Sequence, residues 1–170
     1  ENEGSTQAGE NEITDLVLTH LASTEISTFN LLNSQSQRDV QYLTNMVDGL
    51  VEVDTNGQPV PCIATDWGSE DGGQTWTFNL REGVKWVDVN AEEKADCTAW
   101  DFASGLEWVL NFHKNDSANV SMPSEMIEGA KEYYEYTKTL SKEEAYALNA
   151  GEGSKFREMV KIDTPDDYTL

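Results

Sequence analysis

Residues that could bind a metal ion are few and scattered in this chain. Its 170 residues include two histidines, His20 and His113, and neither has a cysteine or carboxylate at the spacing of a zinc or nickel site. Two acidic turns, 54–57 and 69–73, begin like calcium loops, but neither continues to the glutamate that closes that pattern. We therefore expect no metal site and no cofactor.

Motifs for nucleophilic or nucleotide chemistry are also missing. The sequence has no Gly-x-Ser-x-Gly turn and no phosphate-binding glycine-rich loop, and neither Cys62 nor Cys97 has a neighbouring histidine. Carboxylates are so numerous that any pair of them carries no information about acid–base catalysis. The sequence favours a binding protein over an enzyme.

Five tryptophans offer flat faces on which a sugar could stack. Trp76 and Trp86, however, are in register with apolar neighbours on expected strands, and Trp100 and Trp108 lie beside the apolar stripe of an expected helix. We expect most tryptophans to belong to the core, and we keep glycan binding as an alternative function.

The clearest elements that could position functional side chains are two strands between residues 75 and 86. Trp76, Phe78 and Leu80 alternate with polar residues, which is the period of a strand with one buried face. The alternation stops at 81–83 and resumes at 84–86. The pattern predicts that these two strands pair with each other as a hairpin.

A helix is expected to follow from residue 98. Thr98 stands three residues before Asp101, which predicts an N-terminal cap with a carboxylate in the first turn. Apolar residues then recur at helical spacing, namely Ala99, Phe102, Ala103, Leu106, Val109 and Leu110. The strands therefore lead into a capped amphipathic helix.

Other capping patterns predict further helices. Ser36 with Asp39 predicts a helix that runs to about residue 49, Ser124 predicts one over 124–134, and Ser141 with Glu144 predicts a short one. Short strands are expected at 16–18, 50–53 and on both sides of the turn at 164–166, whereas 22–37 is expected to be a loop. The fold class is α/β, a mixed α and β lobe with a largely antiparallel sheet.

The order of these motifs resembles the oligopeptide-, dipeptide- and nickel-binding receptors of ABC importers. The family pattern of a "tFxLRxGVkf" strand pair followed by "TAxDf" is matched here by TWTFNLREGVKW at 75–86 and TAWDF at 98–102. Residues 47–67 are similar to the family's "GL…D…G…P.lA..W" run, and 160–170 to its "V…D..TL" end. One departure is Asp88-Val89, where the family usually has Asp-Gly, and another is the longer acidic loop before residue 98.

The resemblance implies a fold, a function and a partial chain. Residues 14–170 would form an N-terminal lobe portion of a two-lobed periplasmic-binding-protein-like fold, truncated at the C-terminal end. The implied function is a substrate-binding receptor that captures oligopeptides for import, with ABC transporter permease subunits as partners. A nickel or other small-ligand receptor of the same family is the first alternative, and an exported glycan-binding module is the second.

The resemblance also implies a ligand-binding segment. In the oligopeptide receptors the loop that leaves the first strand pairs its main chain with the peptide, and here that loop holds residues 23–27. Thr24, Glu25 and Ile26 are therefore the candidate substrate-binding residues. The acidic residue that holds the peptide amine in these receptors lies beyond residue 170.

Charge and composition narrow the partners and the location. With 11 Lys and Arg against 32 Asp and Glu, the net charge of −21 would repel nucleic acid and anionic lipid surfaces. Residues 1–13 are polar and acidic, as expected of a flexible leader. The resemblance implies an extracytoplasmic protein, either a cell-surface lipoprotein of a Gram-positive bacterium or a periplasmic one, attached to the membrane only through a lipid anchor outside this chain.

An exported protein with two cysteines can form a disulfide. Given the implied location, Cys62 and Cys97 are a possible pair, because neither has another evident use. Buried free thiols would look the same in the sequence.

Overall fold

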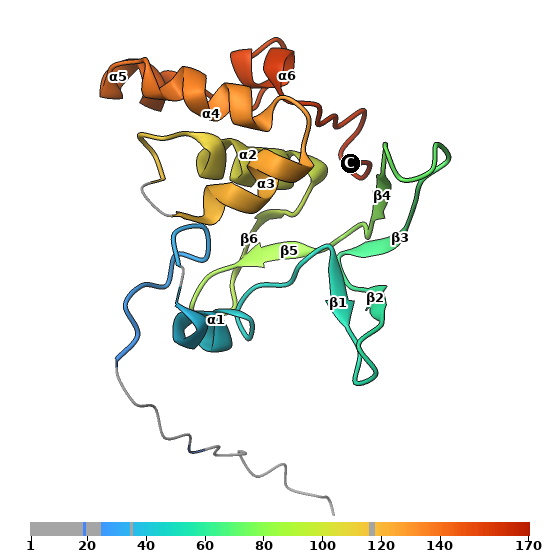
Figure 1. Ribbon diagram of the computed structural model, residues 1–170. Coiled ribbons are helices and arrows are strands. Elements are labelled where there is room, and N and C mark those ends of the chain that lie inside the picture. Colours follow the sequence, from blue (N-terminus) through green and yellow to red (C-terminus); the bar gives the residue numbers. More distant parts are fainter. Residues whose placement is uncertain (1–18, 20–24, 35, 116–117) are drawn as a thin grey trace, which may run out of the picture.

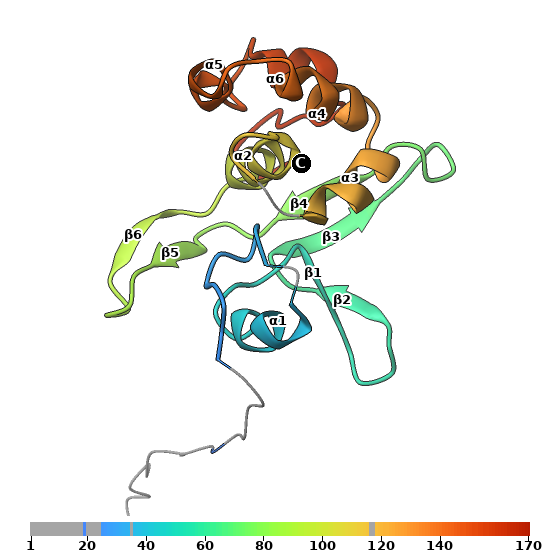
Figure 2. The ribbon, with the colours of Figure 1, turned by 60° about the vertical axis from the view of Figure 1, so that its left-hand side comes forward.

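The computed structural model describes residues 19, 25–34, 36–115 and 118–170. The expected leader at 1–13 and the expected strand at 16–18 lie outside these residues. Figures 1 and 2 show helices α2 to α6 on one side of the molecule, and three β-hairpins with helix α1 on the other. We refer to these two parts as the helical layer and the hairpin layer. No helix in the described part of the chain is long and apolar enough to cross a bilayer.

The helical layer follows the hairpins in the sequence. It consists of α2 Ala99–Leu110, the 3-10 turn η1 Ala118–Val120, α3 Ser121–Met126, α4 Ala130–Lys138, α5 Lys142–Ala147 and α6 Lys155–Met159. Its core is formed by buried residues from α2, α4 and the segment from residue 150 onward, namely Ala103, Leu110, Ala130, Tyr133, Ala150, Phe156 and Val160. The rings of Tyr133 and Phe156 meet edge to face at 5.2 Å between centroids.

Local capping explains where two of these helices begin. At α2 the Asp101 carboxylate accepts the main-chain N–H of Thr98 at 2.8 Å, so the predicted helix start is confirmed. At α5 the predicted box is reciprocal, because Ser141 and Glu144 each accept the other's N–H, at 3.2 and 2.9 Å. Helix α6 has a cap that the sequence reading missed, in which Ser154 Oγ accepts an N–H from the first turn.

The helix predicted over 124–134 is wrong, because two helices, α3 and α4, meet there at Gly129. Gly129 has a φ of +80°. A Cβ at this position would lie 1.7 Å from the carbonyl oxygen of Met159. Only glycine allows the two segments to approach this closely, so the chain turns at Gly129 instead of continuing as one helix.

The hairpin layer contains the strands and α1. Helix α1 is Gln37–Leu43, and the strands are β1 Val51–Val53, β2 Pro59–Pro61, β3 Ala64–Gly68, β4 Thr77–Leu80, β5 Lys85–Val87 and β6 Glu93–Asp96. They pair antiparallel as β1–β2, β3–β4 and β5–β6, in three separate two-stranded sheets. The predicted pairing of β4 with β5 is therefore wrong, although both strands exist.

Non-local partners explain this difference. One edge of β4 pairs with β3, and at the other edge Phe78 exchanges hydrogen bonds of 2.8 and 3.0 Å with Leu170. Strand β5 instead pairs with the acidic loop that was expected to lack strands. There the Asp88 carboxylate accepts the N–H groups of Asn90 and Glu92 at 2.8 and 3.1 Å and closes a turn.

A second, smaller core joins the two layers. Its buried members are Ile63, Ala64, Leu80 and Ala99, so the first residue of α2 packs against β3 and β4. Fully buried Ala99 also donates its N–H to Asp167 O at 2.8 Å. The predicted fold class, mixed α and β with antiparallel pairing, is confirmed, although in the described part of the chain the strands pair as small hairpins and not as one sheet.

Candidate functional site

Two of the three predicted substrate-binding residues lie in a segment of irregular structure before α1. We call residues 25–34 the anchored segment. It contains Glu25, which is exposed, and Ile26, which is half-buried, while Thr24 lies outside the described residues. The guanidinium of Arg38 donates to the main-chain carbonyl of Glu25 at 2.7 Å. The carbonyl of Glu25 is therefore already engaged within the chain.

The main chain of the anchored segment is open at two residues, whereas residues 30–34 form a hydrogen-bonded turn. Neither Ile26 nor Phe29 forms a main-chain hydrogen bond within the part of the chain that the structure describes. The Phe29 side chain is 65% exposed, which is unusual for a large apolar residue. Among the described residues, Ile26 and Phe29 thus present N–H and C=O groups without a partner, next to an exposed aromatic ring.

Helix α1 holds this segment through a side chain that was expected to cap the helix. Asp39 was predicted to cap α1 with Ser36, but α1 has no side-chain cap, and Asp39 instead accepts hydrogen bonds from Ser27 and Ser34. The cap prediction is wrong because the donors nearest to this carboxylate come from outside the helix.

A groove of about 1200 Å³ lies between the helical layer and the β4 edge. Apolar side chains line most of it, including Phe78, Trp100, Phe102, Leu106, Ile127 and Val160. Arg157 is one of its polar lining residues, with its guanidinium 4.9 Å from the ring centre of Trp100. The lining suits an apolar side chain or segment.

Arg157 is nevertheless largely occupied by the chain itself. It donates to Ala150 O at 2.8 Å, to Ile162 O at 2.9 Å and to Thr164 Oγ1 at 2.8 Å. Burial lowers the pKa of its guanidinium, which stays charged because the normal pKa of arginine is far above neutral. Its role in the described structure is to tie α6 to the segment that follows it.

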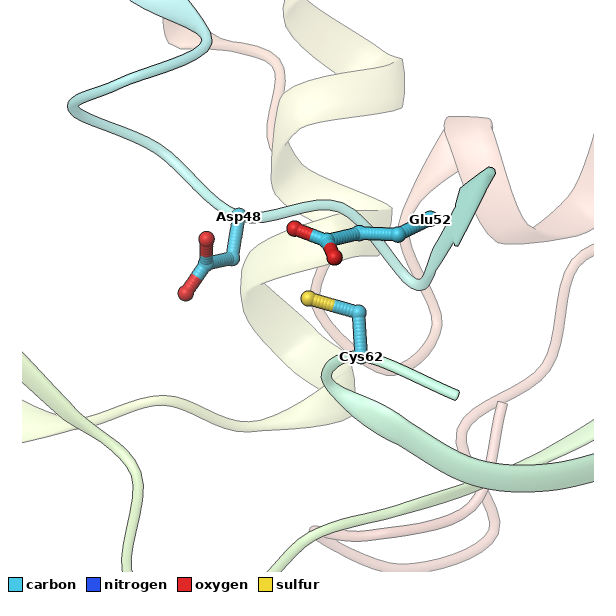
Figure 3. Close-up of side chains that lie close together, drawn as sticks. All are labelled: Asp48, Glu52 and Cys62. Atoms are coloured by element: carbon cyan, nitrogen blue, oxygen red, sulfur yellow. The ribbon is translucent and has the colours of Figure 1, made fainter. Parts of the chain in front are cut away.

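Asp48, Glu52 and Cys62 form a small group of possible metal ligands (Figure 3). One ligand atom from each lies within 4.8 Å of the others, and both carboxylates are on exposed residues. Burial and the two nearby carboxylates raise the pKa of the Cys62 thiol. Since the thiolate is the form that binds metal, this environment works against metal binding at neutral pH.

The disulfide predicted between Cys62 and Cys97 is not formed in the structure, where both residues are free thiols. The Cys62 thiol points toward Asp48 and Glu52. Cys97 is buried just before α2, where burial and then the Asp101 charge raise its pKa. The two side chains therefore have separate surroundings.

The tryptophans are less buried than the sequence suggested. Trp76 and Trp86 are 51% and 44% exposed, so the expectation that they belong to the core is wrong. Trp67, Trp100 and Trp108 are half-buried.

Comparison with known proteins places this chain in a family. Residues 58–170 match the family "Bacterial extracellular solute-binding proteins, family 5 Middle". The oligopeptide-binding protein SarA of Streptococcus gordonii is 32% identical over 119 residues, which are 70% of this chain and 18% of that protein. The oligopeptide-binding protein AliB of Streptococcus pneumoniae is 35% identical over 101 residues, which are 53% of this chain and 16% of that protein. The chain thus spans less than a fifth of the length of these relatives.

Solved structures of oligopeptide receptors have a similar fold. The pheromone receptor PrgZ superposes with a TM-score of 0.67 at 25% identity, over 88% of this chain and 25% of that one. The substrate-binding domain of an oligopeptide ABC transporter from Bacillus anthracis superposes with a TM-score of 0.66 at 23% identity, over 89% of this chain and 24% of that one. This chain therefore has part of the periplasmic-binding-protein fold, and it belongs to family 5 of the bacterial extracellular solute-binding proteins.

Proposed function

We propose that this chain is part of the substrate-binding receptor of an ABC importer that captures oligopeptides outside the cytoplasmic membrane. The observation that carries the proposal is that two relatives above 30% identity are named oligopeptide-binding proteins. The open main chain at Ile26 and Phe29 supports it, because main-chain pairing recognises peptides whatever their side chains. Thr24, Glu25 and Ile26 remain the proposed substrate-binding residues.

The receptor acts by binding and not by catalysis. Residues 14–170 supply part of its N-terminal lobe, and residues 1–13 connect this lobe to a lipid anchor outside the chain, on a Gram-positive cell surface or in a periplasm. Its partners are the peptide and the permease subunits of the importer. Closure of two lobes around the peptide is driven by the higher affinity of the closed state for the ligand.

The nickel and glycan alternatives have weaker support. Among the described residues the one group of possible metal ligands contains no histidine and a thiol with a raised pKa, whereas imidazole suits nickel. Trp76 precedes β4 and Trp86 lies on β5, and the two strands belong to different hairpins.

Calorimetric titration of the full-length protein that carries these residues tests the proposal. A pool of tri- to pentapeptides should give saturable binding, and chitin- or glucan-derived oligosaccharides and Ni²⁺ should give none. Binding of a sugar or of nickel without peptide binding would contradict the proposed function.

A further inference from the structure

Asp39 occupies an unusual place for a carboxylate in this chain. It lies on α1 and has no exposed surface, whereas most acidic residues of this chain are exposed. Its Oδ1 accepts the main-chain N–H of Ser27 at 3.0 Å, and its Oδ2 accepts the hydroxyls of Ser27 and, at 3.2 Å, of Ser34. One carboxylate therefore binds both ends of the anchored segment, over twelve residues of sequence on one side and five on the other.

The protonation state fits this role. The hydrogen bonds from Ser27, first from its hydroxyl and then from its N–H, lower the pKa of Asp39. The group is therefore ionised at neutral pH and acts only as an acceptor, so it can satisfy all three donors at once. A neutral amide in its place would turn an N–H₂ group toward one of these donors.

Other contacts hold the same segment without replacing Asp39. Arg38 binds the carbonyl of Glu25, and the Asn119 amide donates to Leu32 O at 3.0 Å and Ser34 O at 2.8 Å. Arg38 and Asn119 thus donate hydrogen bonds to main-chain carbonyl groups. Asp39 is the residue that fixes the N–H of Ser27, directly beside Ile26.

We propose that Asp39 is a positioning residue for ligand binding, which fixes Ser27 so that the main chain of Ile26 and Phe29 stays open to an incoming peptide. The inference rests on the proposed function, since it assumes that the ligand is a peptide bound through its main chain. Asp39 itself does not contact the ligand. Its effect on affinity is therefore independent of the peptide's side chains.

The test compares three variants in the full-length protein. Asp39→Asn keeps the shape but removes the charge and replaces one of the two acceptor oxygens by an N–H₂ group, and Ser27→Ala removes one donor. Asp54→Asn is the matched control, because Asp54 accepts the N–H groups of Asn56 and Gln58, both at 2.8 Å, in the remote β1–β2 turn. Thermal unfolding of each variant shows which fraction is folded at the temperature of the titration.

Affinity is measured by calorimetry with two pentapeptides of unlike side chains, penta-alanine and Lys-Leu-Lys-Leu-Lys. Asp39→Asn should raise the Kd of the folded protein about tenfold for both, the size expected for a lost hydrogen bond to a charged group. Ser27→Ala should raise it less, and Asp54→Asn should leave it unchanged. An unchanged Kd in Asp39→Asn, or a change for only one peptide, would overturn the proposal.

Amide hydrogen exchange separates this inference from the proposed function. In Asp39→Asn the N–H of Ser27 should exchange faster than in the unsubstituted protein, with or without a ligand. If the unsubstituted protein binds neither peptide but the Ser27 amide still loses protection in the variant, the proposed function fails and the anchoring by Asp39 stands. Unchanged exchange at Ser27 would overturn the anchoring itself.

Discussion

The helical layer and the hairpin layer differ in how they hold their side chains. In the helical layer Tyr133 and Phe156 have no exposed surface. In the hairpin layer every residue of β5 and β6 is exposed, and Val89 at their turn is 98% exposed. The helical layer therefore supplies most of the burial that stabilises the chain, whereas the hairpins depend on main-chain pairing and on their turns.

Polar groups show the same contrast. The buried Glu107 carboxylate on α2 accepts from Tyr133 Oη at 2.8 Å, from Asn111 Nδ2 at 3.0 Å and from Lys114 Nζ at 2.7 Å. On the β5–β6 hairpin the Lys85 and Asp96 side chains of an ion pair are 34% and 52% exposed to solvent. The comparison predicts that equivalent substitutions have very different effects in the two layers.

The largest effect should come from aromatic truncation. Phe156→Ala removes a fully buried ring and should lower the free energy of unfolding by about 3 to 5 kcal/mol. Trp86→Ala on β5 is the matched change at an exposed site and should cost less than about 1 kcal/mol. Urea denaturation measures both, and equal costs would mean that the Trp86 ring is buried in solution as Phe156 is.

Loss of a buried charge should have the next largest effect. Glu107→Gln leaves the Lys114 ammonium buried without its counter-charge and should cost about 3 kcal/mol. Asp96→Asn breaks the exposed pair with Lys85 and should cost between about 0 and 1 kcal/mol. The midpoints of guanidinium denaturation would show the difference. A small cost for Glu107→Gln would indicate that water reaches the pair.

Glycine substitutions compare the two layers at one backbone conformation. Gly129 and Gly57 have φ values of +80° and +78°, but a Cβ would clash with Met159 only at Gly129, and nothing lies within 4 Å at Gly57. Gly57→Ala should cost about 1 to 2 kcal/mol from backbone strain alone. Gly129→Ala should cost more, because the main chain of Met159 must also move. Equal shifts in Tm would show that α4 can separate from the segment at Met159.

Reduction should have the smallest effect. Because Cys62 and Cys97 are free, a reducing agent should not change the unfolding midpoint, and the denatured, unreduced protein should titrate as two thiols. A disulfide closing this loop would instead contribute roughly 3 to 4 kcal/mol. Thiol titration that finds none would show that the two cysteines pair in solution.

Local features were predictable from the sequence in both layers. The caps at Thr98 with Asp101 and at Ser141 with Glu144 depend on residues three apart, so the chain specifies them without its fold. The periodicity also located β4 and β5 correctly. It gave no information on their partners, because β4 pairs with Leu170, some ninety residues away, and β5 pairs with an acidic loop.

The candidate site was only partly predictable. The resemblance to known receptors located Glu25 and Ile26, and the structure shows that these residues belong to a segment held in place by side chains. The role of Asp39 was not predictable, because its spacing from Ser36 fits a local helix cap. Only the fold brings Ser27 and Ser34 to its carboxylate. The burial of Glu107 was missed for a similar reason. The apolar periodicity of a helix predicts which apolar residues are buried, but it does not predict that a charged residue is buried together with its hydrogen-bond partners.

The most direct test of the account is amide exchange of the full-length protein with and without saturating peptide. The N–H groups of Ile26 and Phe29, which have no hydrogen-bond partner among the described residues, should gain protection when peptide binds, while those of the β5–β6 hairpin should not change. Peptide binding that leaves the anchored segment unprotected, and protects the hairpin layer instead, would contradict it.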